Sequence, residues 1–136
     1  MRDEIVALGA RVHLFVRPDK REEFISLWRD VLNCNIAERD VGMEYPVALV
    51  VFPDGSSFSA EFSDLAPDEY SGDRLGDEHA FRGAWLEFKT HDVAAIEQKL
   101  RDSGIRHFRH APSPHTYFSA PGGQVFRIID VAYTGP

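Results

Sequence analysis

The sequence predicts an α+β fold made of two copies of a βαβββ module. Three observations support this: an alternating strand pattern runs into an amphipathic helix near the start, the same order returns in the second half, and a turn-and-strand motif occurs twice. The two motifs, PDGSSF at 53–58 and PGGQVF at 121–126, lie 68 residues apart. We therefore expect a single domain over residues 1–136, with repeats at about 9–63 and 80–133 and an acidic linker at 64–79.

The first repeat begins with a strand and a helix. RVHLFVR at 11–17 alternates as a half-buried strand does, and Pro18 prevents its continuation. One side of the strand carries Val12, Leu14 and Val16, and the other carries Arg11, His13 and Phe15. Asp19 and Glu22 have the spacing of a capping box. The apolar positions that follow have helical spacing: Phe24, Leu27, Trp28, Val31 and Leu32.

Strands are expected after this helix at 46–52, at 57–62 and, on weaker patterning, at 41–45. In the segment 57–62, the apolar side chains of Phe58, Ala60 and Phe62 face the helix. The side chains of Ser57, Ser59 and Glu61 then face the opposite side. The sequence thus places polar groups on the sheet face away from the helix.

The second repeat has the same construction. A strand at 84–89 precedes a helix that Asp92 caps and Gly104 ends. Further strands are expected at 115–119, at 124–131 and, more weakly, at 105–109. In the last strand, Phe126 and Ile128 face the helix, which leaves the charged Arg127 on the opposite face.

Composition narrows the class of protein. The net charge of −7 argues against a nucleic-acid surface and against an anionic membrane as partner. The single cysteine, Cys34, excludes a disulfide framework within the chain and is expected to be a packed small residue. Without a long apolar run, the sequence predicts a cytoplasmic protein in a reducing setting.

Four segments carry a resemblance to a known family. They are RVHLFVRPD at 11–19, leading into FISLWRDVL at 24–32, then FKTHDVAAI at 88–96 and FSAPGGQVF at 118–126. In this order and spacing they resemble the vicinal oxygen chelate superfamily, which includes glyoxalase I, extradiol dioxygenases and bleomycin-resistance proteins. The resemblance implies a U-shaped mixed eight-stranded sheet, helices on its convex face, a concave ligand cavity and a homodimer. It also implies, in the enzymatic members, a divalent metal held by one inward side chain from each of four strands.

The four implied metal-ligand positions fall on Arg11, Ser59, Trp85 and Arg127. A guanidinium stays protonated and an indole is only a donor, so neither can bind a cation. On this register the sequence predicts no metal cofactor, and it leans against an enzyme without deciding the point.

A register two residues further along is the alternative. It brings His13, Glu61 and Glu87 inward, with His115 or Tyr117 able to join. A histidine with two carboxylates suits zinc, iron or manganese. That set would make the chain a metal-dependent lyase, isomerase or dioxygenase of the same superfamily.

The sequence therefore predicts a metal-free protein that binds a small anionic or aromatic molecule, as the sequestering bleomycin-resistance branch does. Arg127 and Arg11 would contact its polar group, and Trp85 and Tyr117 would stack on its flat part. The other expected lining residues are His13, Ser59, Glu61, Glu87 and His115.

Two further interpretations stay open. In one, Glu61, Glu87, Arg11 and Arg127 form a purely structural ion-pair network. In the other, the chain is a structural or partner-binding module that uses its acidic segment at 64–78.

Overall fold

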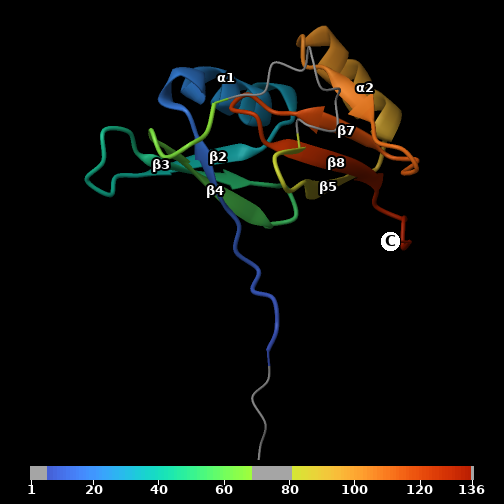
Figure 1. Cartoon of the computed structure of the whole chain (residues 1–136), viewed down its shortest axis with the longest axis horizontal. Helices are drawn as coiled ribbons and strands as arrows, with labels where there is room; N and C mark the ends of the chain where they lie inside the picture. The colour runs from blue at the N-terminus through green and yellow to red at the C-terminus, as the bar shows by residue number, and fades with distance from the viewer. Residues whose placement is uncertain (1–5, 69–80, 136) are drawn as a thin grey trace, which may run out of the picture.

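Each half of the chain folds as a strand, a helical segment and three further strands (Figure 1). The structure is a computed structural model that describes residues 6–68 and 81–135. The first half comprises β1 (His13–Val16), η1 (Pro18–Lys20), α1 (Arg21–Ser26), η2 (Leu27–Val31), β2 (Asn35–Arg39), β3 (Val47–Val51) and β4 (Ser57–Phe62). The second half comprises β5 (Leu86–Thr90), α2 (Val93–Asp102), β6 (His107–Arg109), β7 (Thr116–Ser119) and β8 (Val125–Asp130).

The strands form two four-stranded mixed sheets, in the orders β1-β4-β3-β2 and β5-β8-β7-β6. In each sheet the first pair is parallel and the other pairs are antiparallel. The predicted α+β class and the two βαβββ modules are thereby confirmed. The eight strands that the resemblance implied for one sheet are divided between two.

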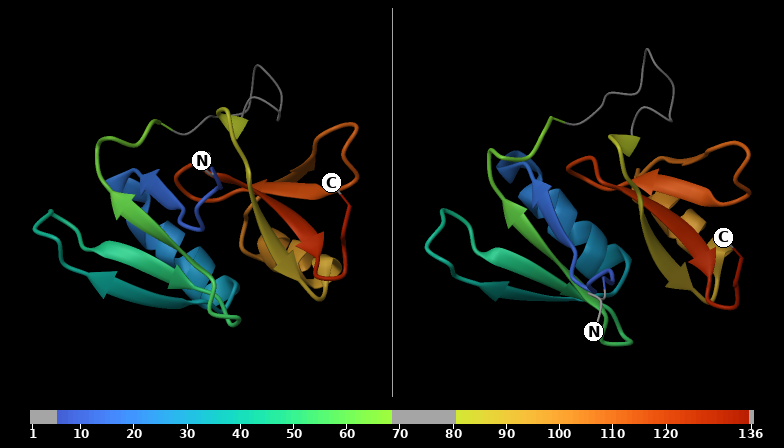
Figure 2. Two further views of the ribbon diagram at one scale, coloured as in Figure 1. Left: turned by 90° about the horizontal axis from the view of Figure 1, so that it is seen from below. Right: turned by 60° about the horizontal axis from the view of Figure 1, so that its bottom comes forward.

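The helical segments cover the same side of both sheets (Figures 1 and 2). The opposite faces of the two sheets carry no helix, and we call them together the helix-free face. Residues 6–12 lead away from the sheets toward the N-terminus (Figure 1). Among the described residues, no helix is long and apolar enough to cross a membrane.

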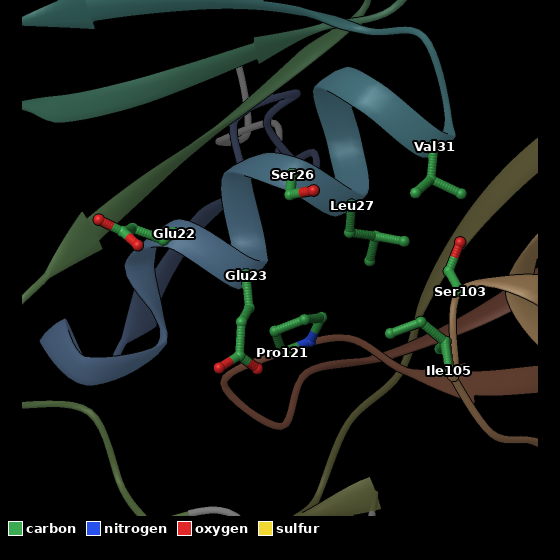
Figure 3. Close-up of a pocket in the computed structure, with 8 residues that line it drawn as sticks. All are labelled: Glu22, Glu23, Ser26, Leu27, Val31, Ser103, Ile105 and Pro121. Atoms are coloured by element: carbon green, nitrogen blue, oxygen red, sulfur yellow. The ribbon is translucent and has the colours of Figure 1, made fainter.

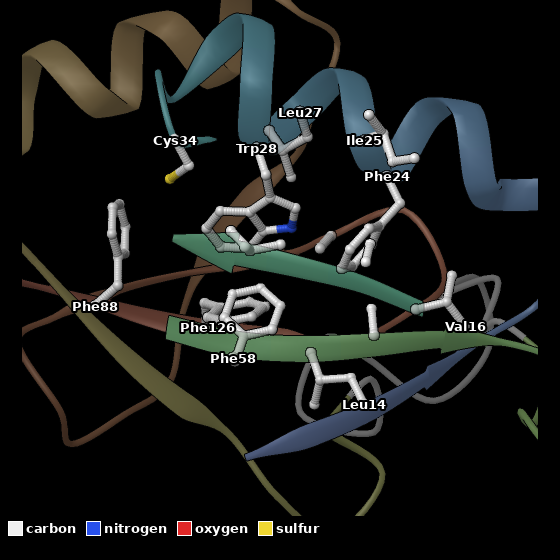
Figure 4. Close-up of a cluster of buried hydrophobic side chains, with 14 of the residues drawn as sticks. Leu14, Val16, Phe24, Ile25, Leu27, Trp28, Cys34, Phe58, Phe88 and Phe126 are labelled. Atoms are coloured by element: carbon white, nitrogen blue, oxygen red, sulfur yellow. The ribbon is translucent and has the colours of Figure 1, made fainter. Parts of the chain in front are cut away.

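One hydrophobic core joins the two modules on the helix side. Trp28, at 0% exposure, lies at its centre, with ring centroids 5.1 Å from Phe58 of the first sheet and 4.8 Å from Phe126 of the second (Figure 4). Leu14 and Val16 of β1 are buried in the same core. Because a single indole contacts both sheets, neither module has a separate core on this side.

The turn before β8 ties the second module to β1. The side-chain amide of Gln124 donates to the carbonyl oxygen of Phe15 at 2.8 Å. Gly122, in the same turn, has a φ of +99°, and a Cβ at this position would lie 2.7 Å from Cγ1 of Val16. Only glycine allows the turn to approach β1 this closely.

The predicted alternation is confirmed in the strands that matter for the site. Phe58, Ala60 and Phe62 are buried in the core, whereas Ser59 and Glu61 are only half-buried. Phe126 and Ile128 lie in the same core as Trp28. Arg127 therefore faces away from the helices, as the sequence predicted.

Two sequence predictions in the first module were wrong. The strand expected at 41–45 lies instead at Asn35–Arg39, because the Asp40 carboxylate accepts the N–H of Gly42 at 2.9 Å and Gly42 has a φ of +85°. These features make the segment a turn. Asp19 lies within η1 and caps nothing, since no side chain caps the start of α1.

The predictions for the second helix were correct at both ends. Asp92 caps α2 by accepting the N–H of Ala95 at 3.0 Å, and Gly104 follows the helix with a φ of +75°. The acidic linker predicted at 64–79 falls mostly outside the described residues, so its boundaries stay predictions.

Candidate functional site

Strand pairing places four polar residues at one level on the helix-free face. In the first sheet the residue paired with Ser59 is His13, and in the second the residue paired with Arg127 is Glu87. Side chains of paired residues lie on the same face of a sheet. The two modules therefore have equivalent pairs at this level: His13 with Ser59 in the first and Glu87 with Arg127 in the second.

This pairing differs from the alignment of the first strands that the resemblance suggested. Arg11 and Trp85 each lie two residues before the partners that the sheets provide, and both precede the strands themselves. Arg11 is exposed, and Trp85 is 42% exposed. The predicted set of Arg11, Ser59, Trp85 and Arg127 thus does not lie side by side across the strands. Comparing sequence motifs does not reveal which residues of neighbouring strands pair.

In the first module, three polar side chains are joined by hydrogen bonds. Nδ1 of His13 lies 2.7 Å from Oγ of Ser59, and Nε2 of the same ring lies 3.0 Å from Oε1 of Glu61. The His13 ring also makes an edge contact with Phe15 at 5.0 Å between centroids. His13 is 38% exposed and Glu61 is 17% exposed, so the cluster is reachable from solvent.

In the second module, a charged pair lies under an aromatic ring. Nε of Arg127 donates to Oε2 of Glu87 at 3.0 Å, and Nη2 donates to the same oxygen. The guanidinium carbon lies 4.3 Å from the centroid of the Trp85 ring, which is a cation–π contact. Arg127 is only 9% exposed, so its charge is held between the carboxylate and the indole.

These contacts keep Arg127 charged despite its burial. Burial lowers the pKa of the guanidinium, but the hydrogen bonds and charges of Glu87 and Tyr117 outweigh this effect, so the pKa lies above its ordinary value. Of the four residues of the possible ion-pair network, Glu87 and Arg127 therefore do form an ion pair in the structure. Glu61, the other predicted acid, contacts His13 instead.

A cluster of mostly aromatic side chains lies beside this pair on the second module's helix-free face. Tyr117 is buried and forms a cluster with Phe108, Val125 and Phe81. Its ring lies 6.1 Å from that of Trp85, and its hydroxyl donates to Oγ of Ser113 at 3.1 Å. Tyr117 thus supports Trp85 from beneath rather than presenting its own ring to a ligand.

His115 does not join this group. Its ring contacts Tyr133 at 4.6 Å, and it lines a pocket of about 260 Å³ between α2 and β8, together with Glu97 and Arg109. The pocket includes Val93 of α2, so it lies on the helix side of the second sheet. The sequence predicted a strand beginning at His115, but β7 begins one residue later, at Thr116, so the alternation of that strand does not fix the side of the sheet that His115 reaches.

A pocket of about 250 Å³ lies where the two modules meet. Its walls are Phe15 and His13 from β1, Leu86 from β5, the start of β8, Pro67 of the acidic segment, and residues that follow that segment. The full lining is His13, Leu14, Phe15, Pro67, Phe81, Arg82, Ala84, Leu86, Gly123, Gln124 and Val125. Of the predicted ligand-binding residues only His13 lines it, since periodicity within one strand cannot predict contacts between modules.

A further pocket of about 320 Å³ lies on the helix side, between α1 and the turn after α2 (Figure 3). It is lined by Glu22, Glu23, Ser26, Leu27, Val31, Ser103, Ile105 and Pro121. It contains none of the ligand-binding residues predicted from the sequence. Glu22, Leu27 and Val31 were predicted as part of a helix, but the sequence did not predict that they would line a pocket.

The side chains on the helix-free face do not fit the divalent metal that the superfamily's enzymes use. Within residues 6–68 and 81–135, no three side chains of His, Cys, Asp or Glu come together as a metal-binding group. His13 and Glu61 are adjacent, but Glu87 is bound by the guanidinium of Arg127. A cation that used Glu87 as a ligand would have to displace the guanidinium of Arg127 from it.

Solved structures share this architecture. A glyoxylase/bleomycin resistance protein/dioxygenase domain from Frankia sp. EAN1pec superposes with a TM-score of 0.64 at 18% identity, over 91% of this chain and 97% of that one. TnmS3, an antibiotic binding protein from Streptomyces sp. CB03234, gives a TM-score of 0.60 at 17% identity, over 94% and 98% of the chains. A glyoxalase/bleomycin resistance protein from the same Streptomyces strain gives 0.54 at 20%, over 88% and 98%.

These likenesses show the fold. The chain has the fold of the glyoxalase/bleomycin resistance protein/dioxygenase superfamily, and the resemblance read from its sequence is confirmed at that level. No protein-family model matches the chain, and no curated protein matches it in sequence.

Proposed function

We propose that this protein binds a small, flat organic molecule on the helix-free face without a metal ion. The observation that carries the proposal is the Arg127 guanidinium, held between Glu87 and the Trp85 ring. In the superfamily that the sequence resembles, this strand position holds a metal ligand. Here it supports an aromatic platform instead.

The platform is suited to stacking. One face of the Trp85 indole rests on Arg127, and 42% of the residue stays exposed. Tyr117 packs against it and is itself fixed by neighbouring rings, so the indole is held in place before a ligand arrives. A rigid aromatic surface loses little conformational entropy on binding.

The polar groups that would orient the ligand lie in the first module. Ser59, His13 and Glu61 offer donors and acceptors, and His13 borders the 250 Å³ pocket at the module junction. Ligand sites combine apolar walls with a few such polar groups. An anionic group on the ligand would meet the exposed Arg11 rather than Arg127, because Glu87 already neutralises Arg127.

The role we propose is sequestration. It is supported by the antibiotic-binding protein and the bleomycin resistance protein among the structural neighbours. We further propose that the protein acts as a homodimer in the cytoplasm, where the buried free thiol of Cys34 would stay reduced.

A metal-dependent enzyme is the second candidate. The contact between His13 and Glu61 favours it, since the two could supply a metal's first ligands. Their third partner, Glu87, would first have to leave Arg127. A partner-binding module is the third candidate, but most of its proposed surface at 64–78 lies outside the described residues.

The binding proposal can be tested with 8-anilinonaphthalene-1-sulfonate, a flat aromatic anion whose fluorescence reports binding. We expect Trp85→Ala to weaken its affinity by about tenfold, as the loss of an aromatic contact implies. Leu49→Ala is the matched control, because Leu49 is 39% exposed on the helix-free face of the other module. Equal affinity in the wild-type protein and Trp85→Ala, or equal loss in Leu49→Ala, would count against the platform.

A further inference from the structure

A serine, a histidine and a glutamate on the helix-free face form a continuous hydrogen-bonded chain. Oγ of Ser59 lies 2.7 Å from Nδ1 of His13, and Nε2 of His13 lies 3.0 Å from Oε1 of Glu61. β1 and β4 run parallel with His13 paired to Ser59, which brings the ring directly over the hydroxyl. The strands, and not mobile loops, hold the three groups in place.

The chemistry of the three side chains decides which of them donates each hydrogen bond and which accepts it. When Glu61 is ionised and the ring of His13 is neutral, the ring carries its proton on Nε2 and donates it to Glu61, because an ionised glutamate only accepts hydrogen bonds. Nδ1 is then bare and accepts the hydroxyl proton of Ser59. The alternative acceptor for that proton, the carbonyl oxygen of Val12, lies farther away at 3.4 Å.

This arrangement has the parts of an activated nucleophile: a hydroxyl, a base within hydrogen-bond distance, and a carboxylate that orients the base. Compared with the usual serine triad, the two ring nitrogens exchange roles. The exchange leaves the proton transfer unchanged, because either nitrogen of a neutral imidazole can serve as the base.

A substrate can reach these hydrogen-bonded residues. His13 is 38% exposed and also forms part of the wall of the 250 Å³ pocket at the module junction. Phe15, Phe81, Leu86 and Val125 give this pocket an apolar lining. The volume lies below the roughly 300 Å³ at which sites for drug-sized ligands begin, so it suits a short acyl group.

We propose that Ser59 is a nucleophile that accepts an acyl group from a small activated ester. Oγ bonds to the carbonyl carbon while its proton passes to Nδ1 of His13. The bond from that carbon to the leaving oxygen breaks, and the leaving group takes the proton as an alcohol. Water then attacks acyl-Ser59 by the same route, which releases a carboxylic acid and restores the hydroxyl.

In this proposal Ser59 and His13 are catalytic residues, and Glu61 is a positioning residue that acts through His13. The activity goes beyond ligand binding and does not depend on the Trp85 platform. It needs no metal, so it can be measured with a chelator present, which separates it from the metal-dependent candidate.

The experiment uses the full chain with EDTA, a fluorophosphonate probe that modifies activated serines, and p-nitrophenyl acetate as substrate. Peptide mass spectrometry should place one phosphonyl group per chain on Ser59. His13→Gln should slow both labelling and ester cleavage by about a hundredfold or more, as the loss of a general base does. Ser57→Ala is the matched control, because Ser57 lies on the same strand and face, and it should label as the wild type does.

The role of Glu61 has its own readout. ¹⁵N NMR of the imidazole should find the proton on Nε2 of His13 in the wild-type protein. Glu61→Leu should weaken that preference and slow labelling, whereas replacing a residue that only packs would leave the distribution of the proton between the two nitrogens unchanged.

Three results would overturn the proposal. They are a wild-type protein with no label on Ser59, a His13→Gln variant that labels at the wild-type rate, and labelling of Ser57 as fast as that of Ser59. Any of them would mean that the hydrogen-bonded chain only joins β1 to β4. The first result needs no variant, so a folding defect in a variant cannot hide the answer.

Discussion

Arg127 shows how a charged side chain can lie inside an apolar strand. Its neighbours Phe126 and Ile128 face the core, while the guanidinium lies on the other side against Glu87 and Trp85. Burying a charge is costly unless it is paired and hydrogen-bonded. Both conditions are met here, so the residue stabilises the helix-free face of the second module.

Breaking this pair should destabilise the protein. Arg127→Leu leaves the Glu87 carboxylate without its partner on a half-buried surface. Since losses are large for buried pairs and small for exposed ones, we expect the free energy of unfolding to fall by about 1–3 kcal/mol. Urea denaturation followed by circular dichroism measures this.

Arg29→Leu is the matched control for that variant. Arg29 also bonds to a carboxylate, that of Asp30 at 2.9 Å, but both side chains are more than half exposed. The control should unfold at the wild-type urea concentration. Equal stability of the two arginine variants would show that the Arg127–Glu87 pair does not contribute to the free energy of unfolding as we expect.

Cys34 should be an unreactive thiol. It is 4% exposed, and burial raises the pKa of its thiol to about 11. The thiolate is the reactive form, and at pH 8 its fraction is roughly a hundredfold smaller than for a thiol with the ordinary pKa.

Ellman's reagent should therefore modify the folded protein slowly at pH 8, and faster as the pH rises toward 11. Protein unfolded in guanidinium should react at once, because the thiol then regains its ordinary pKa. Fast, stoichiometric modification of the folded protein at pH 8 would show that Cys34 is accessible and ionised.

At the scale of single residues, alternation predicted much of the site. It placed Arg127, Ser59 and Glu61 away from the helices because a strand has a fixed period of two residues. It could not predict that Glu87 would bind Arg127 or that His13 would lie between Ser59 and Glu61. Those contacts depend on which residues of neighbouring strands pair.

Among the elements, the turn at 121–124 positions β8 against β1. Gly122 combines a left-handed φ of +99° with a missing Cβ that would lie 2.7 Å from the buried Val16. An alanine here would have both a strained backbone and an overlap in the core. The turn would have to move away from β1, and the Gln124 hydrogen bond would move with it.

Gly122→Ala and Gly55→Ala should differ in stability. Gly55 lies in the matching turn of the first module with a φ of +88°, and a Cβ there would meet nothing within 4 Å. We expect Gly55→Ala to cost about 1–2 kcal/mol for the left-handed backbone alone. Gly122→Ala should cost about 1–3 kcal/mol more, because it also overpacks the core.

Thermal unfolding of the two variants in parallel measures the difference. Equal stabilities would mean that the turn does not pack against Val16 as described. A loss confined to Gly122→Ala, with Gly55→Ala unchanged, would support the overlap but not the backbone strain.

Among the strands, β2 could not be predicted from the pattern of apolar residues. Its sequence, Asn35–Arg39, has one partly buried apolar residue, Ile36, because the strand lies at the edge of its sheet. An edge strand with exposed side chains shows no alternation to detect. The predicted strand at 41–45 had more apolar residues, but Gly42 and Asp40 turn the chain there.

For the whole molecule, the duplicated sequence predicted the duplicated fold. The two turn motifs and the two helices were enough to define the modules and the order of elements along the chain, but they did not predict the order of the strands within each sheet. How the modules join was not predictable, because it rests on Trp28 packing against both sheets and on Gln124 bonding to β1. The 250 Å³ pocket is a product of that junction.

We infer that the helix-free face works without a metal ion. Elemental analysis of the untagged protein, after incubation with Zn²⁺, Fe²⁺ or Mn²⁺ and desalting, tests it directly. We predict far less than one ion per chain, because Arg127 holds Glu87 and leaves His13 and Glu61 as an incomplete set of ligands. One ion retained per chain, and lost in His13→Ala, would contradict the account.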